Sequence, residues 1–156
     1  MTMKLPPFQA LLDEHRADVY RFLVATVGPS EADDCFQETW ISALRSYPTL
    51  RRGDNLRAWL FRIAQNKSID AHRARSRRAV PVAAVPERGA PLLPDSDPEL
   101  WALVRDLPTK QRTAVFCRSV LGMPYDELAL LLESSEDAAR RNVHEGLKRL
   151  KGEMSE

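Results

Sequence analysis

A cluster of prolines divides this chain into two parts. Residues 79–98 contain five of its eleven prolines, and proline removes a backbone hydrogen-bond donor and blocks helix formation. A stretch of this composition is typical of an extended linker. We therefore expect two small domains, in residues 1–78 and 99–156, joined by a Pro-rich linker over residues 79–98.

Apolar residues on the N-terminal side of the linker recur at helical spacing. They predict a helix over residues 8–27 that ends at Gly28, a second helix with Ser30 as its N-cap, and a third from Leu56 to about Arg78. Three helices of this size can share one core. The apolar stripe expected to be buried in the second helix is Phe36, Trp40, Ala43, Leu44 and Tyr47.

The C-terminal part predicts shorter helices and a helix-turn-helix. Thr109 and Ser134 are the expected caps of two of its helices, and a turn at residues 133–135 separates the last two. The last helix is expected to bury Ala139, Val143, Leu147 and Leu150. The predicted fold class is all-α, with an N-terminal helical bundle and a C-terminal helix-turn-helix.

Positive charge is concentrated in one segment. The whole chain has a net charge of +1, yet residues 51–78 hold nine Arg and Lys against two Asp, a net +7. Such a concentration indicates a polyanionic partner. Its cations lie near Tyr47, Trp59 and Phe61, a combination that suits capture of single-stranded nucleic acid, although for Trp59 a place in the core is the favoured interpretation.

The last predicted helix carries a second, smaller group of cations. Arg141, His144 and Lys148 recur opposite its apolar stripe, with Arg140 beside them. Side chains of this kind reach phosphates and base edges in a major groove. A solvated polar face is the alternative interpretation, because carboxylates share this helix.

Other classes of function find little support in the residues. No apolar run approaches the ~20 residues that span a bilayer, and the N-terminus does not resemble a signal peptide, so we expect a cytoplasmic chain without membrane insertion. Cys35 and Cys117 lack metal-ligand spacing, and no phosphate-binding glycine loop or catalytic motif occurs. We expect no enzyme activity, no metal and no cofactor.

Three segments together resemble extracytoplasmic-function (ECF) sigma factors, the small two-domain class of bacterial transcription initiation factors. The segment DDCFQETW matches an acidic, Gln-Glu-Thr-aromatic signature of that family. LRAWLFRIAQNKSIDAHRARSR matches its Trp-Leu-x-x-Ile-Ala-x-Asn signature, and YDELALLLESSEDAARRNVHEGLKRL aligns with its C-terminal helix-turn-helix. The resemblance covers residues 8–151.

The resemblance implies a role for each part of the chain. Asp34, Gln37 and Glu38 would bind the clamp of core RNA polymerase, and the last helix would read the minus-thirty-five promoter element. Promoter DNA and, as a candidate, an anti-sigma factor would be further partners. The residues implied in binding and melting the minus-ten element are Arg51, Arg52, Asn55, Arg62, Asn66, Lys67 and Arg73. Those implied in minus-thirty-five binding are Arg140, Arg141, His144 and Lys148.

The C-terminal part departs from the family pattern at several positions. Glu133 stands where the turn usually has Gly, Ala138-Ala139 where the recognition helix usually begins Thr-Val, and Glu145-Gly146 where Arg-Ala is typical. These departures keep two alternatives open besides a sigma factor. One is a sigma-like protein that occupies an anti-sigma partner, and the other is a stand-alone helix-turn-helix regulator.

Overall fold

The computed structural model describes residues 6–50, 55–77 and 97–154, and these form helices without any strand. The all-α prediction is confirmed. Residues 51–54 of the expected basic loop and residues 79–96 of the expected linker lie outside the described residues. The helices are α1 (Phe8–Val27), α2 (Pro29–Ser46), the 3-10 turn η1 (Tyr47–Thr49), α3 (Leu56–Arg77), α4 (Pro98–Arg105), α5 (Thr109–Ser119), α6 (Tyr125–Leu132) and α7 (Glu136–Met154). Over the ranges described, no helix is long and apolar enough to cross a membrane.

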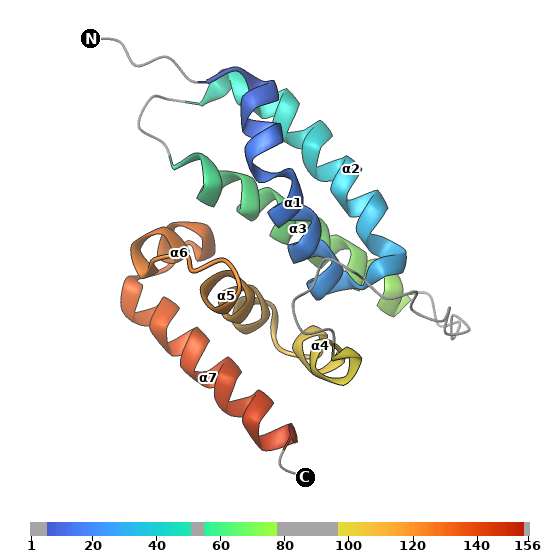
Figure 1. Ribbon diagram of the computed structural model, residues 1–156, viewed down its shortest axis with the longest axis vertical. Helices are drawn as coiled ribbons and strands as arrows, with labels where there is room; N and C mark the ends of the chain where they lie inside the picture. Colours follow the sequence, from blue (N-terminus) through green and yellow to red (C-terminus); the bar gives the residue numbers. More distant parts are fainter. Residues whose placement is uncertain (1–5, 51–54, 78–96, 155–156) are drawn as a thin grey trace.

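Helices α1, α2 and α3 form the N-terminal bundle (Figure 1). The chain reverses between α1 and α2 at Gly28, whose φ of 88° lies in the left-handed region that glycine adopts without strain. Helix α2 then begins at Pro29, so the prediction of Ser30 as the cap was wrong. A proline fits the first helical position because its missing N–H would have no partner there.

Side-chain contacts join the ends of these three helices. Phe8 at the start of α1 packs edge-on against Trp40 of α2, with ring centroids 5.9 Å apart. Asn55 caps α3, because its side-chain oxygen accepts a 2.9 Å hydrogen bond from the Ala58 amide. At the other end of α3, the His72 ring bonds the Thr26 carbonyl of α1 at 2.7 Å. Burial, with Arg112 nearby, lowers the pKa of His72, which favours the neutral ring as donor.

A buried arginine links the first two helices of the C-terminal part. Arg112 of α5 is 4% exposed and donates to the carbonyls of Arg105 and Leu107 at 3.0 and 3.3 Å. These bonds tie α5 to the end of α4, and burial lowers the pKa of Arg112. Thr109 does not cap α5 as predicted. Instead its hydroxyl oxygen accepts from the Arg112 guanidinium at 3.4 Å.

Helices α6 and α7 form the predicted helix-turn-helix. Glu133 ends α6 with φ 54° and ψ 48°, the left-handed conformation in which the family usually has glycine. The Ser135 hydroxyl oxygen accepts from the Ala138 amide at 3.1 Å, so Ser135 caps α7 and the prediction of Ser134 was wrong by one position. Ser134 bonds the Ser135 carbonyl instead.

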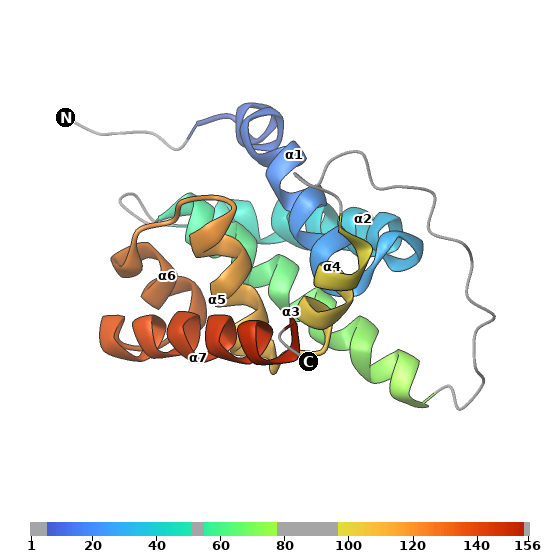
Figure 2. The same ribbon diagram turned by 60° about the horizontal axis from the view of Figure 1, so that its bottom comes forward.

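The N-terminal bundle and helices α4–α7 pack directly against each other. Helix α1 contacts α4 and α5, and α3 contacts α6 (Figures 1 and 2). Phe22 of α1 lies at this junction, fully buried, with its ring 5.5 Å from Phe61 of α3 and 5.6 Å from Phe116 of α5. The two parts therefore share one continuous hydrophobic core.

Gly146 sets how closely α7 approaches α5. A Cβ at this position would lie 2.5 Å from the Val115 Cγ2 and 3.4 Å from the Gln111 carbonyl oxygen. The close approach explains a glycine inside a helix, where it costs about 1 kcal/mol relative to alanine. Leu147, which the apolar stripe predicted to be buried, is 45% exposed, because the buried line of α7 runs through Ala139, Val143, Gly146 and Leu150.

We predict that Gly146→Ala destabilises the protein although alanine favours helix. Val115 is branched at Cβ and cannot move aside easily, and overpacking of this kind costs about 1–3 kcal/mol, which exceeds the gain in helix propensity. Urea unfolding followed by circular dichroism would show a lower midpoint.

The matched control is Gly152→Ala in the same helix, because nothing lies within 4 Å of a Cβ at Gly152. We expect the control to leave the midpoint unchanged or raise it. An equal rise for both variants would contradict a steric role for Gly146.

Candidate polymerase-binding and DNA-binding faces

Helix α2 presents its acidic residues to solvent. Asp34, Gln37 and Glu38 are all exposed, as the sequence predicted. The neighbouring Asp33 is engaged differently, because it accepts a 2.8 Å hydrogen bond from the Tyr20 hydroxyl of α1, which raises the pKa of Tyr20. Of the consecutive aspartates, Asp34 is therefore the one available to a partner.

Two large apolar side chains extend this exposed face of α2. Ile41 is 49% exposed and Leu44 is 57% exposed. The prediction that Leu44 is buried was wrong, because the buried side of α2 is centred on Cys35, Thr39 and Ala43. Ile41 follows Asp34 by seven residues, so helical spacing could have assigned it to the acidic face. A mixed acidic and apolar face of this kind is typical of a protein-binding surface.

An open groove separates α2 from α3, and acidic and basic side chains line it. Glu38 of α2 and Lys67 and Asp70 of α3 contribute to its walls. Cys35 also lines it, and burial, followed by the nearby carboxylates, raises the pKa of this thiol to about 11. The thiol is therefore protonated and a poor nucleophile at neutral pH. Among the described residues, no three His, Cys, Asp or Glu side chains gather as metal ligands.

The candidate minus-ten residues of α3 divide between two sides of the helix. Arg62, Asn66 and Arg73 fall on one stripe, four and seven residues apart, and Asn55 extends this stripe to the start of the helix. Lys67 lies about 100° away and faces the groove beside α2. Asn66 and Arg73 are exposed. Arg51 and Arg52 lie outside the described residues.

The aromatic residues near this stripe pack against the core of the N-terminal bundle. Phe61 is fully buried against Phe22, so the prediction that it joins the DNA-capturing group was wrong. Trp59 is half-buried and packs against the core, with its ring 6.2 Å from that of Tyr47. The interpretation of Trp59 as a core-packing residue agrees with this position.

Arg62 is already engaged within the chain. One of its terminal nitrogens donates to the Leu130 carbonyl of α6, and its Nε lies 3.3 Å from a carboxylate oxygen of Glu133. Arg57, five residues earlier in α3, forms a two-bond ion pair with Glu127 of α6. These contacts could not be predicted from local sequence patterns, because the partners are 68 to 71 residues apart.

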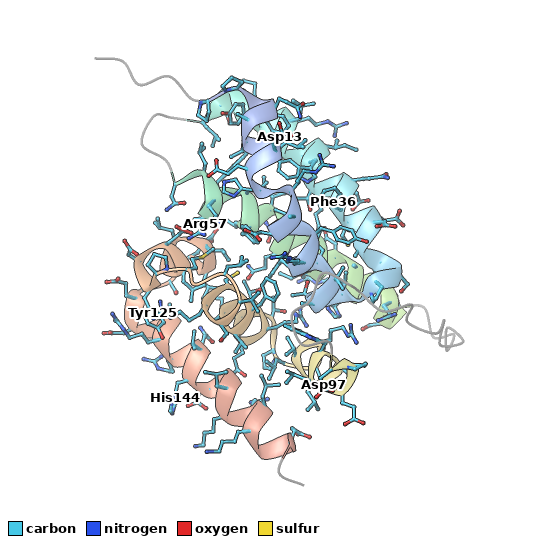
Figure 3. All side chains as sticks on the ribbon, viewed as in Figure 1. Asp13, Phe36, Arg57, Asp97, Tyr125 and His144 are labelled. Atoms are coloured by element: carbon cyan, nitrogen blue, oxygen red, sulfur yellow. The ribbon has the colours of Figure 1, made fainter. Side chains whose placement is uncertain are left out.

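The candidate minus-thirty-five residues form an exposed face on α7. Arg140, Arg141, His144 and Lys148 are all exposed, and His144 projects from α7 away from the neighbouring helices (Figure 3). Arg140 also forms a 3.4 Å ion pair with Asp137.

Tyr125, at the start of α6, was not predicted as part of this face. The Arg118 guanidinium lies 4.2 Å and that of Arg140 lies 4.9 Å from the centre of its ring. Cations over an aromatic face are attracted to it, so Tyr125 orients Arg140. The sequence feature that could have pointed to Tyr125 was an aromatic residue at the start of a predicted helix.

Comparisons with known proteins match the N-terminal and C-terminal parts of the chain to two separate families. Residues 11–78 match the family Sigma-70 region 2, and residues 98–150 match Sigma-70, region 4. The chain is 36% identical to the ECF RNA polymerase sigma factor SigD of Mycobacterium tuberculosis over 162 residues, which covers 92% of this chain and 75% of SigD. It is 30% identical to the RNA polymerase sigma factor CarQ of Myxococcus xanthus, over 96% of this chain and 90% of CarQ.

Solved structures share the fold. The sigma factor RpoE of Bartonella quintana, in complex with the anti-sigma factor NepR, matches with a TM-score of 0.79 at 21% identity, over 95% of this chain and 96% of RpoE. CnrH, in complex with the cytosolic domain of CnrY, matches with a TM-score of 0.73 at 22% identity, over 95% of this chain and 87% of CnrH. The sequence relatives and both matched regions agree: the chain belongs to the ECF group of RNA polymerase sigma factors.

Proposed function

We propose that this sigma factor brings core RNA polymerase to specific promoters and helps to melt them, with each step assigned to a separate face. Residues 1–78 bind the polymerase clamp and the minus-ten element, residues 99–156 bind the minus-thirty-five element, and residues 79–98 connect them. The chain would act in the cytoplasm beside the polymerase, without catalytic activity of its own. An anti-sigma partner, as in the solved RpoE complex, belongs to this proposal.

The exposed face of α2 is the observation that best supports polymerase binding. Its carboxylates supply charge, while Ile41 and Leu44 supply apolar area at the same surface. The opposite side of α2 packs on α1 and α3, so the face is held on a rigid bundle. Charged residues around apolar anchors give both a fast encounter and a stable contact.

The stripe on α3 supports the minus-ten role. Arg73 and Arg62 supply cations for the phosphate backbone, and Asn66 between them offers an amide donor and acceptor for a base edge. A base that is unstacked from the duplex exposes edges that such side chains can read. Lys67, on the groove side, suits a contact to phosphate more than to a base.

The exposed cations of α7 support minus-thirty-five binding. Arg141, His144 and Lys148 occupy successive turns of the second helix of a helix-turn-helix, which is the helix that enters the major groove in this motif. The departures from the family sequence leave these cations in place. Gly146 lies on the side of α7 that packs against α5.

The transcription experiment tests the whole proposal. Core polymerase of the source bacterium, incubated with the purified chain and genomic fragments, is expected to give discrete run-off transcripts that neither component gives alone. Their mapped start sites should share upstream sequence elements. Binding to core without any specific transcript would instead favour a sigma-like protein that does not initiate.

Charge reversal on α2 tests the polymerase-binding face. We expect Asp34→Lys with Glu38→Lys to weaken core binding by at least about tenfold, which corresponds to about 1.4 kcal/mol, because two attractive charges become repulsive. Thermal unfolding should change little, since both side chains are exposed. Fluorescence anisotropy of the labelled chain titrated with core measures the affinity.

The matched control reverses two exposed carboxylates on α1, Asp13→Lys with Glu14→Lys. It makes the same change in net charge at another surface. If control and test variants lose affinity equally, the effect belongs to overall charge and the assignment of α2 is wrong.

A further inference from the structure

One acidic side chain stands among the cations on the outer face of α7. Glu145 is exposed and occupies a position where the family typically has arginine. Glu136 and Asp137 lie in the first turn of α7, where the helix dipole favours anions, and Asp137 also pairs with Arg140. Glu145 lies in the middle of the helix, and among the ion pairs given for the described residues none includes it. Neither the dipole nor an ion pair therefore accounts for its carboxylate.

Glu145 lies on the same face of α7 as the candidate DNA-binding cations. The midline opposite the buried side of the helix runs between Arg141 and Lys148, because successive residues are about 100° apart. Glu145 lies about 50° to one side of this midline and His144 about 50° to the other. Glu145 also follows Arg141 by about 6 Å along the helix axis. A duplex that meets these cations therefore meets the carboxylate as well.

The backbone of α7 is held firmly where Glu145 projects. The next residue, Gly146, brings α7 so close to α5 that an added Cβ would lie 2.5 Å from the Val115 Cγ2. Leu150, one turn further on, is buried in the same core. Glu145 is thus presented from a rigid helix at a fixed spacing from Arg141, as the reading of a base edge requires.

A carboxylate on this face has a cost for DNA binding. The phosphates of any duplex are negative, so Glu145 weakens contact with the DNA backbone regardless of sequence. Arg141, Lys148 and Arg149 are exposed about one turn away and offset part of this repulsion. The remainder is offset where the carboxylate accepts a hydrogen bond from a base.

The chemistry of a carboxylate restricts which base can provide that bond. A carboxylate has acceptors and no donor, whereas arginine has donors and no acceptor. In the major groove guanine presents the acceptors N7 and O6, cytosine presents the N4 amino donor, and adenine presents its N6 donor beside the acceptor N7. The adenine N7 repels a carboxylate that approaches N6, so cytosine suits Glu145 best. Glutamate in place of arginine therefore reverses the preferred base from guanine to cytosine.

We propose that Glu145 is a specificity-determining residue that reads a cytosine of the minus-thirty-five element through the N4 amino group. At duplexes without this cytosine the carboxylate faces DNA unpaired, and its repulsion rejects them. The inference rests on the proposed minus-thirty-five role of α7 and adds a base to it. The alternative role is an ion pair with Arg149, four residues on, which would change helix stability and leave base preference unchanged.

Selection from random duplexes measures the base preference of the full-length chain. A library of DNA duplexes with a random central segment is incubated with the chain alone and, in parallel, with the chain bound to core polymerase, and the bound fragments are sequenced. We expect cytosine at one position of the enriched motif. Fluorescence anisotropy with the enriched duplex then measures affinity, and exchange of that C·G pair for G·C should raise the dissociation constant by about tenfold.

Two substitutions of Glu145 and one control test the assignment. Glu145→Ala should reduce discrimination at this position to less than about twofold and strengthen binding to non-matching duplexes, while the other positions keep their preferences. Glu145→Arg should change the preferred base there from cytosine to guanine. The matched control, Glu153→Ala, removes another exposed carboxylate of α7 about two turns further on and should leave the motif unchanged.

The outcomes separate this inference from the promoter role. A motif that both Glu145 substitutions leave unchanged would overturn the inference, and so would the absence of an enriched motif in both selections. Lower thermal stability of Glu145→Ala with an unchanged motif would assign the residue to the ion pair with Arg149. Failure of the transcription experiment with the predicted change of base intact would instead reject the promoter role and retain the base contact.

Discussion

The aromatic contact of Phe22 with Phe61 and Phe116 is the interaction on which the arrangement of the whole chain depends. Burial of one such side chain stabilises by about 1.5–3 kcal/mol, and each edge-to-face pair adds about 0.5–1.5 kcal/mol. Phe61 belongs to the region 2 segment and Phe116 to the region 4 segment. Separating the two segments would expose Phe22, so the apolar junction supplies most of the attraction and the ion pairs around it fix the orientation.

This junction determines which surfaces a partner can reach. The acidic and apolar face of α2 and the cationic face of α7 remain exposed, whereas Arg62 is held by α6. In this arrangement the face proposed for polymerase is exposed, while Arg62 of the face proposed for melted DNA is engaged by α6.

The sequence was sufficient to predict the helices, the helix-turn-helix and the outward position of Asp34, Gln37 and Glu38. It failed where a choice depended on neighbours in space. Ser134 and Ser135 are equal candidates for the α7 cap until the backbone of the turn is known. Leu44 and Leu147 fit the helical spacing of apolar residues but lie just beyond the edge of the buried face. The contact between the two parts could not be predicted, because Phe22 and Phe116 each fit the core of their own domain and a proline-rich linker sets no distance between them.

The departures of the C-terminal part from its family have a physical explanation in packing. Gly146 permits an approach of α7 to α5 that alanine would prevent, and Glu133 places a carboxylate on Arg62 at the cost of backbone strain. Neither substitution removes a cation from the outer face of α7. These two departures thus concern how the helix-turn-helix is assembled and where it packs on α3, whereas Glu145 places an exposed carboxylate on α7 where the family typically has arginine. The proposed minus-thirty-five binding therefore depends on Arg141, His144 and Lys148, which remain exposed.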